Sequence, residues 1–151
     1  MAPQYKSMKQ VLPLFYRPGL LVGGTLEHDC SLQRSIGYFL EPLVLLAPFA
    51  KKPIKVTLRG NTNSSNDPSV DYYRVCVVPL LKRFLPDNNL HLKILTRGVS
   101  PGGGGEVEFS CPVVRRMRPV QMTDCGKVRR IRGVAYPPST TTTATNFSPP
   151  T

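Results

Sequence analysis

The sequence predicts an α+β fold, in which helices cover one face of a mixed β-sheet. Two long segments place apolar residues at helical spacing, and three short segments alternate apolar and polar residues as half-buried strands do. They occur in the order helix, strand, helix, strand, strand, which favours a sheet backed by helices. The chain has 151 residues, of which 40% are hydrophobic, and this is enough for one domain with a core.

The first predicted helix spans residues 32–47. Ser31 stands where a helix N-cap is favoured, because its hydroxyl can accept a bond from an unpaired backbone N–H. Pro42 should bend the helix, because proline lacks a backbone donor, and Pro48 should end it. The buried stripe is predicted to consist of Leu32, Ile36, Phe39, Leu40, Leu43, Val44 and Ala47.

The second predicted helix spans residues 68–84. Asp67 is its predicted N-cap, and Pro68 occupies the first helical position, where a missing N–H leaves no bond unmade. Tyr73 falls on the apolar stripe, so we expect it to be buried rather than to stack on a nucleic-acid base. The stripe is predicted to consist of Val70, Tyr73, Val77, Leu80, Leu81 and Phe84.

Residues 54–58, 90–96 and 106–111 are predicted to be strands, because each alternates apolar and polar side chains. Residues 97–105 join the last two strands and contain four consecutive glycines. Glycine has no Cβ, so this loop can adopt backbone angles closed to other residues and let another segment of chain approach closely. A flexible hairpin loop is the alternative interpretation.

Weaker signals lie on both sides of this pattern. Residues 11–16 and 20–22 are short strand candidates, and residues 25–30 are predicted to be a polar loop. Further along the chain, residues 120–122 and 128–136 are candidates for two additional strands.

The charge balance favours an acidic partner. The net charge is +11 and the isoelectric point is about 9.9, and nucleic acid is the commonest partner of so basic a chain. Basic residues concentrate between residues 115 and 132, where Asp124 is the lone acid. This cluster either follows a nucleic-acid backbone or forms a solvated surface. Its candidate RNA-binding residues are Arg115, Arg116, Arg129, Arg130 and Arg132.

A second candidate site involves three arginines that each stand beside a glycine or proline turn. They would form one phosphate-binding rim if the ends of their strands converge, and the backbone N–H groups of the four glycines would add a cradle. The alternative is three solvated loop arginines. No Gly-Lys-Ser/Thr follows the glycines, so the loop is not a nucleotide-binding P-loop. The candidate residues are Arg17, Arg59, Arg97, Gly102, Gly103, Gly104 and Gly105.

No metal site or membrane segment is predicted. The four cysteines lie far apart without zinc-finger spacing, so we expect free thiols. His28, Asp29 and Cys30 are adjacent, but three consecutive residues do not complete a tetrahedral site. No apolar run approaches the roughly 20 residues needed to cross a membrane.

Several motifs occur together in a specific order. They include Arg-Gly-Asn-Thr-Asn at residues 59–63 and Arg-Gly-Val-Ser-Pro-Gly-Gly-Gly-Gly-Glu-Val at residues 97–107. The others lie at residues 16–24, 27–30, 37–41, 46–49, 67–71 and 130–136. Together they resemble the RNA 3′-terminal phosphate cyclase family, and the closer similarity is to its cyclase-like branch.

The resemblance implies a partial copy of a repeated unit of four strands and two helices. It runs from about residue 14 to residue 136. We therefore expect a divergent N-terminal segment over residues 1–13 and a cyclase-like domain over residues 14–136. Residues 137–151 are rich in Pro, Ser and Thr, so a disordered tail is predicted there.

The resemblance also implies a function in RNA metabolism. In true cyclases a histidine of a later unit accepts AMP from ATP, and neither His28 nor His91 matches that position, so no catalytic residue is expected. A non-catalytic scaffold is implied, which binds pre-ribosomal RNA, small-subunit processome proteins and a ribosome-assembly GTPase in the nucleolus, without a cofactor. The alternatives are a cyclase that uses ATP and Mg²⁺, an endonuclease of pre-ribosomal RNA, and a fragment without a stable fold.

Overall fold

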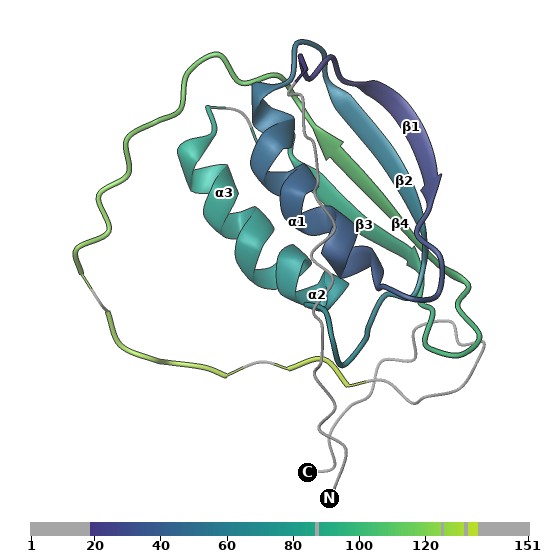
Figure 1. The fold of residues 1–151 in the computed structure, drawn as a ribbon. Coiled ribbons are helices and arrows are strands. Elements are labelled where there is room, and N and C mark those ends of the chain that lie inside the picture. The colour runs from purple at the N-terminus through teal and green to yellow at the C-terminus, as the bar shows by residue number, and fades with distance from the viewer. Residues whose placement is uncertain (1–18, 87, 125, 132, 136–151) are drawn as a thin grey trace, which may run out of the picture.

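The computed structural model describes residues 19–135, apart from residues 87, 125 and 132. It confirms the predicted α+β class, since one mixed four-stranded sheet carries helices on a single face (Figure 1). The strand order is β1-β2-β4-β3, with β1 parallel to β2 and the other pairs antiparallel. The elements are β1 (Gly24–Asp29), α1 (Ile36–Leu46), a 3₁₀ turn (Ala47–Phe49), β2 (Ile54–Gly60), α2 (Val70–Tyr72), a π-helical turn (Tyr73–Val77), α3 (Val78–Phe84), β3 (His91–Thr96) and β4 (Gly105–Cys111).

The central strands β2 and β4 carry the middle of the core. Val56 lies opposite Phe109, and Leu58 lies opposite Val107, and all four side chains are almost fully buried beneath the helices. The alternation predicted for β2 and β4 is therefore confirmed, because side chains two residues apart share one face of a strand. On β3, Leu92 is buried as predicted, whereas Thr96 is exposed. Residues on the other face of β2 and β4 are exposed or half-buried.

Helix α1 begins four residues later than the sequence predicted. Ser35 is its N-cap, and the N–H of Ile36 donates to the carbonyl of Asn61 at 2.8 Å. The predicted cap, Ser31, lies outside the helix with a φ of 58°, and the following Leu32 is exposed. The tertiary bond to the end of β2 therefore sets the start of the helix, which sequence spacing alone does not reveal.

The two prolines of this region behave differently. Pro42 lies inside α1, and the bend expected there stays a prediction. Pro48 was expected to end the helix, and α1 does end before it, at Leu46. The chain then makes the 3₁₀ turn Ala47–Phe49, in which Pro48 is buried. Proline is tolerated there because its missing N–H falls in the first turn, where no intrahelical partner exists.

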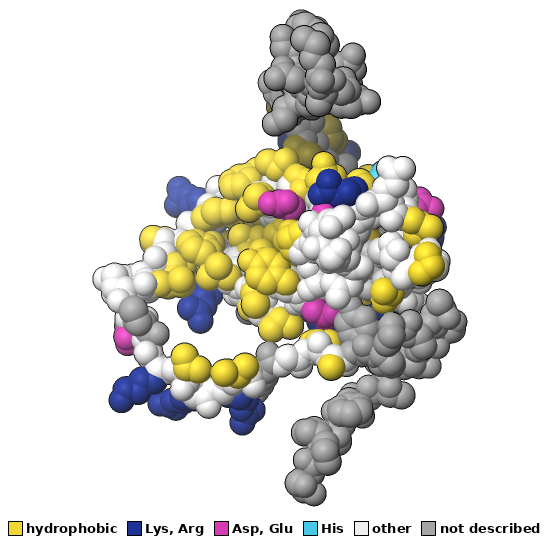
Figure 2. Space-filling model, turned by 60° about the horizontal axis from the view of Figure 1, so that its bottom comes forward, with side chains coloured by type: hydrophobic (Ala, Val, Ile, Leu, Met, Phe, Trp, Pro, Cys, Tyr) yellow, Lys and Arg dark blue, Asp and Glu magenta, His cyan; other side chains and the backbone are white. Residues whose placement is uncertain are grey.

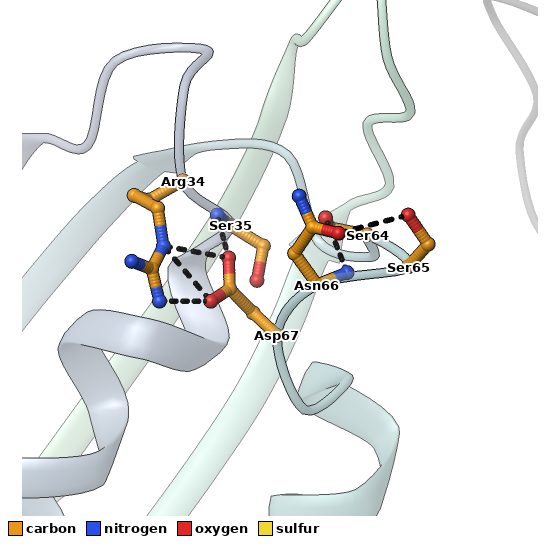
Figure 3. A network of polar contacts seen from close by, with 6 residues as sticks. All are labelled: Arg34, Ser35, Ser64, Ser65, Asn66 and Asp67. Carbon is orange, nitrogen blue, oxygen red and sulfur yellow. Dashed lines mark hydrogen bonds and ion pairs between the residues drawn. The ribbon is translucent and has the colours of Figure 1, made fainter. Parts of the chain in front are cut away.

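The second helix is capped by Ser69, and the prediction of Asp67 as its N-cap is wrong. The Ser69 hydroxyl accepts a bond from the N–H of Tyr72 at 3.1 Å. Asp67 instead accepts bonds from the Ser35 N–H at 2.9 Å and from the Nε of Arg34 at 2.9 Å (Figure 3). Its carboxylate thus connects the loop before the second helix to the N-terminus of α1.

A π-helical turn lies in the middle of the second helix and shifts its buried stripe. Pro79 follows this turn, and a wider turn relieves the clash between a proline ring and the preceding carbonyl. The extra residue rotates the later positions about the axis, so Leu80 is 45% exposed although it was predicted to be buried. Tyr73, before the shift, is buried as predicted. No described helix has the length and apolar content to cross a membrane.

Strand β1 was not predicted, since residues 25–30 were expected to form a polar loop. It pairs in parallel with β2 along its whole length, from Gly24 opposite Ile54 to Asp29 opposite Arg59. It lies at the sheet edge, and its residues after Gly24 are all exposed, so its sequence needs no alternation of apolar residues. The candidate strand at residues 20–22 is not a strand in the structure.

The described part of residues 112–135 contains no helix or strand, so the two strands predicted there are wrong. The segment leaves β4 and runs as a long arc beside the helices (Figure 1). A short apolar run becomes a strand only if it finds a pairing edge, and the apolar side chains here, such as Val128 and Ile131, are about nine-tenths exposed. The strand predicted at residues 11–16 lies outside the described residues, as do the predicted segment 1–13 and tail 137–151.

Candidate nucleic-acid interface

The positive charge is distributed very unevenly along the chain. We call residues 19–111 the folded body and residues 112–135 the basic segment. The folded body holds ten Lys and Arg residues against eight Asp and Glu residues, so it is nearly neutral. The basic segment holds seven Lys and Arg residues against one acid in only 24 positions. More than half of the net charge of +11 therefore belongs to the basic segment.

The candidate arginines of the basic segment are accessible. Arg115, Arg116, Arg129 and Arg130 are all exposed, while Arg132 lies outside the described residues. Figure 2 shows Lys and Arg side chains spaced along the loop, with an open space between the loop and the body. Side chains spaced along an extended backbone can each reach a phosphate of a polyanion, and contacts of this kind release bound counterions.

Arg118 connects the basic segment to the folded body. Its backbone N–H donates to the carbonyl of Phe84 at 2.8 Å, and its guanidinium donates to the carbonyl of Pro86 at 3.0 Å. The last carbonyls of a helix lack intrahelical partners, so a basic residue there is favourable. Upstream, the N–H of Val114 donates to the carbonyl of Pro48 at 2.9 Å. Sequence reasoning did not assign this anchoring role to Arg118, because the residue resembles the other arginines of the cluster.

The three turn arginines do not form one rim. Arg59 lies on the face of the sheet opposite the helices and pairs with Glu27 at 3.1 Å and Glu106 at 3.5 Å. Arg97 turns towards the helices and makes two bonds to the carboxylate of Asp71, at 2.6 and 2.9 Å. Arg17 lies outside the described residues. The ends of β2 and β3 do converge, but the side chains of Arg59 and Arg97 lie on opposite faces of the sheet and therefore apart from each other.

The bond to Arg97 has an electrostatic consequence for Asp71. The guanidinium lowers the pKa of the Asp71 carboxyl below its ordinary value, against the opposing effect of burial. Asp67 shows the same effect beside Arg34, which donates to it and stacks over the Tyr38 ring at 3.8 Å. Both pairs join the helix layer to neighbouring segments, so their charges are used within the fold.

The outer face of the sheet is balanced in charge. Lys55 pairs with Glu108 at 2.9 Å, and this bond lowers the pKa of the Glu108 carboxyl. With the pairs of Arg59, basic and acidic side chains alternate across β1, β2 and β4. Such a surface attracts a polyanion only weakly, because each cation has an acid beside it.

The glycine loop is packed against the body rather than open. The N–H of Gly103 donates to the carbonyl of Val99 at 3.1 Å, and Gly105 pairs with Gly60 as the first residue of β4. A Cβ on Gly105 would come within 2.5 Å of the Gly60 carbonyl oxygen. Gly102 and Gly104 are exposed. The glycines thus permit a close backbone approach, as predicted, whereas phosphate binding by the loop stays a prediction.

Cys30 and Cys111 are buried thiols. Burial raises the pKa of each to about 11, and Asp29 adds to the effect at Cys30. They and the exposed Cys76 are free, as expected for the described cysteines. Within the part of the chain that the structure describes, no three His, Cys, Asp or Glu side chains are grouped as metal ligands would be.

A comparison with known protein families matches residues 6–144 to the RNA 3′-terminal phosphate cyclase family. The chain belongs to this family. The matched range includes the whole folded body and the whole basic segment of this family member. The resemblance found in the sequence motifs is therefore confirmed, and so is the partial copy of the family fold.

Several relatives of this cyclase-family chain are substantially similar. It is 59% identical over 124 residues to the mouse protein named RNA 3′-terminal phosphate cyclase-like protein, and 57% identical to the human protein of that name. It is 50% identical over 122 residues to the fission yeast protein named rRNA processing protein rcl1. These alignments cover 80 to 82% of this chain but 33 to 34% of each relative. The chain thus spans about a third of the length of these relatives.

Proposed function

We propose that this chain acts in ribosomal RNA processing as a non-catalytic factor, which binds RNA through the basic segment. The fission yeast relative is named an rRNA processing protein, and the mammalian relatives are named cyclase-like. The observation that carries the proposal is the separation of charge: seven basic residues lie in the basic segment, beside a nearly neutral body. We place the function at this segment and not at the glycine loop.

The physical basis is electrostatic and independent of base sequence. Each phosphate that a Lys or Arg neutralises makes the slope of log K against log salt steeper, that is more negative, by about 0.7 for single strands and about 0.9 for duplexes. The described arginines of the basic segment are exposed and their backbone has no regular hydrogen bonding, so the segment can adapt to an irregular RNA surface. The body pairs most of its charges and should add little to the slope.

Two variants with the same change in charge test this division. The first replaces Arg115, Arg116, Arg129 and Arg130 by Gln. The control replaces four exposed basic residues of the body by Gln, namely Lys51, Lys52, Arg83 and Lys93. Binding to a structured ribosomal RNA fragment is measured by filter binding across a salt series. We expect the slope of log K against log salt to become shallower by about 3 in the first variant and to change by less than about 1 in the control. Equal slopes for the two variants would refute the assignment to the basic segment.

The non-catalytic part of the proposal has its own test. A cyclase of this family would carry AMP on a histidine, and the described histidines are His28, whose ring contacts Phe39 at 5.2 Å between centroids, and His91 on the exposed face of β3. Incubation of the purified chain with ATP labelled in the α-phosphate should leave no covalent label. A labelled peptide would replace our proposal by the cyclase function, and cleavage of the RNA probe would replace it by an endonuclease.

The finer assignments belong to the same proposal. We place the chain in small-subunit processing within the nucleolus, as a scaffold for processome proteins that include a ribosome-assembly GTPase. Support comes from the resemblance to the cyclase-like branch alone. Affinity purification of the tagged chain from nuclear extract, compared with the variant that lacks four arginines, should recover small-subunit precursors. Recovery of large-subunit precursors instead would contradict this assignment.

A further inference from the structure

The turn at residues 31–34 lies at the end of β2 and is fixed on both sides. Cys30 before it and Ser35 after it are each 1% exposed. The N–H of Cys30 donates to the carbonyl of Arg59 at 2.8 Å, and Ser35 is the N-cap of α1. The four residues between these anchors belong to no helix or strand, so their own contacts decide whether the turn stays in place.

Two side chains hold the turn against other segments. Arg34 donates from its Nε to the Asp67 carboxylate at 2.9 Å, and Figure 3 shows this pair beside the start of α1. Leu32 lies on the glycine loop, since a Cβ on Gly103 would come within 2.6 Å of the Leu32 Cδ2. The carbonyl of Leu32 also accepts a bond from the side-chain amide of Asn61, but at 3.4 Å this bond is long. The charged pair of Arg34 and Asp67 is therefore the strongest polar contact of the turn, and we call it the latch.

Two features of the same region oppose the closed turn. Ser31 has a φ of 58°, a backbone conformation that residues other than glycine rarely adopt. The Ser35 hydroxyl and the Asn61 side-chain oxygen are buried, and neither has a hydrogen-bond partner among the described residues. A buried polar atom without a partner is unfavourable, and movement of the turn would bring it into contact with water. The latch and the packing of Leu32 must offset both costs.

The glycine loop next to the turn is held more firmly. The N–H and the hydroxyl of Thr62 both donate to the carbonyl of Gly98, at 2.8 and 3.0 Å. Thr62 and Gly98 are buried, so these bonds are shielded from water. Arg97 adds its two bonds to Asp71, at 2.6 and 2.9 Å. The loop is thus a fixed surface, and the turn is the part that can move against it.

We propose that residues 31–34 form a flap, which opens about Cys30 and Ser35 when the latch is released. In the closed form the flap packs Leu32 on the glycine loop and keeps the oxygens of Ser35 and Asn61 out of water. In the open form these oxygens and the Cys30 thiol are accessible at the end of β2. A segment held by few contacts opens at a lower free energy than the whole domain. The flap is a conformational device of the folded body, and it can fail without affecting the proposed RNA binding by the basic segment.

Cys30 can report the opening, and Cys111 is an internal control in the same chain. Both thiols are buried, and burial raises the pKa of each to about 11. Cys111 lies opposite Ile54, at the other end of β2 from the flap. Alkylation of the full chain by iodoacetamide at one fixed pH is followed for each cysteine by mass spectrometry of its peptide. In the unmodified chain we expect Cys30 to react faster than Cys111, because the flap opens more often than the whole domain unfolds.

Two aspartate variants distinguish release of the flap from general destabilisation. Asp67→Asn removes the charge that binds Arg34 but keeps an oxygen that can accept the Ser35 N–H bond. Asp71→Asn is the matched control, because it makes the same change in the pair with Arg97 and leaves the latch intact. We expect alkylation of Cys30 to become at least about fivefold faster in Asp67→Asn and to stay nearly unchanged in Asp71→Asn.

Two leucine variants test the flap without a change in charge. Leu32→Ala removes the packing on Gly103, and Leu95→Ala on β3 is its control, since the two leucines are 56 and 55% exposed. Alkylation of Cys30 should become at least about twofold faster in the first variant only. Three results would overturn the proposal: equal rates for Cys30 and Cys111 in the unmodified chain, the same Cys30 rate in both aspartate variants, or the same Cys30 rate in both leucine variants.

Discussion

Ile36 and Ile131 are the same residue in two very different regions of the molecule. Ile36 is fully buried at the start of α1, whereas Ile131 is 91% exposed in the basic segment. The body buries a core of apolar residues between helices and sheet, and it pairs many of its charges. The basic segment leaves both apolar and basic side chains in solvent. The difference teaches that more than half of the net charge belongs to one extended segment and little of it to the fold that precedes this segment.

The same contrast separates two roles for glycine and arginine. In the body, Gly98 and Gly105 allow two backbones to meet, and Arg97 binds Asp71 between sheet and helix. In the basic segment, arginines such as Arg129 are exposed. Residues that are alike in composition therefore serve architecture in one region and are available to a ligand in the other. Substitutions of matched residues in the two regions should reveal this division.

The largest difference is expected between two isoleucine truncations. Ile36→Ala should lower the free energy of unfolding by about 2–5 kcal/mol, because it removes a fully buried side chain and leaves a cavity. Ile131→Ala should change it by less than about 0.5 kcal/mol. Urea unfolding followed by circular dichroism measures both. Similar losses would mean that the basic segment packs onto the body in solution.

A smaller difference is expected between two glycine substitutions. A Cβ on Gly98 would lie 2.2 Å from the backbone nitrogen of Gly105, so Gly98→Ala must displace the loop and should destabilise the fold by about 1–3 kcal/mol. A Cβ on Gly133 would meet no atom within 4 Å, so Gly133→Ala should leave stability nearly unchanged. Thermal unfolding of the two variants side by side distinguishes them. A tolerated alanine at Gly98 would show that the glycine loop is loose.

The smallest difference is expected between two aspartates, and it should depend on pH. Arg97 lowers the folded-state pKa of Asp71, so its stabilisation is fully present above the unfolded value of about 4 and is lost as the pH falls through the folded pKa. Asp71→Asn should therefore cost about 1–2 kcal/mol at pH 7 and progressively less towards pH 3. Asp124→Asn, in the exposed basic segment, is the control. A cost for Asp71→Asn that does not change with pH would exclude the ion pair as its cause.

Much of the fold could be predicted because its signals are local. The alternation in β2, β3 and β4 identified the buried faces, and the apolar spacing identified both helices. The helix starts were less accurate, since Ser35 and Ser69 act as caps in place of Ser31 and Asp67. A cap depends on which backbone groups lie nearby, and those come from segments distant in the sequence.

The candidate site was predicted in part. The exposed arginines of the basic segment were identified from charge alone, since a run of basic residues with one acid among them is visible in any fold. The predicted rim of turn arginines does not form, because the side chains of Arg59 and Arg97 at adjacent strand ends lie on opposite faces of the sheet. The ion partners of Arg59 and Arg97 lie on other strands and on α2, and no local pattern indicates them.

By itself, the sequence determined the class of the fold, the faces of its central strands, the family motifs and the place where charge accumulates. These depend on the periodicity and composition of short segments, which physical chemistry translates directly into structure. Only the tertiary structure decided that the polar residues of β1 form a parallel edge strand and that Arg97 is paired. Each of these depends on which distant segments meet, because pairing and burial are properties of contacts between segments.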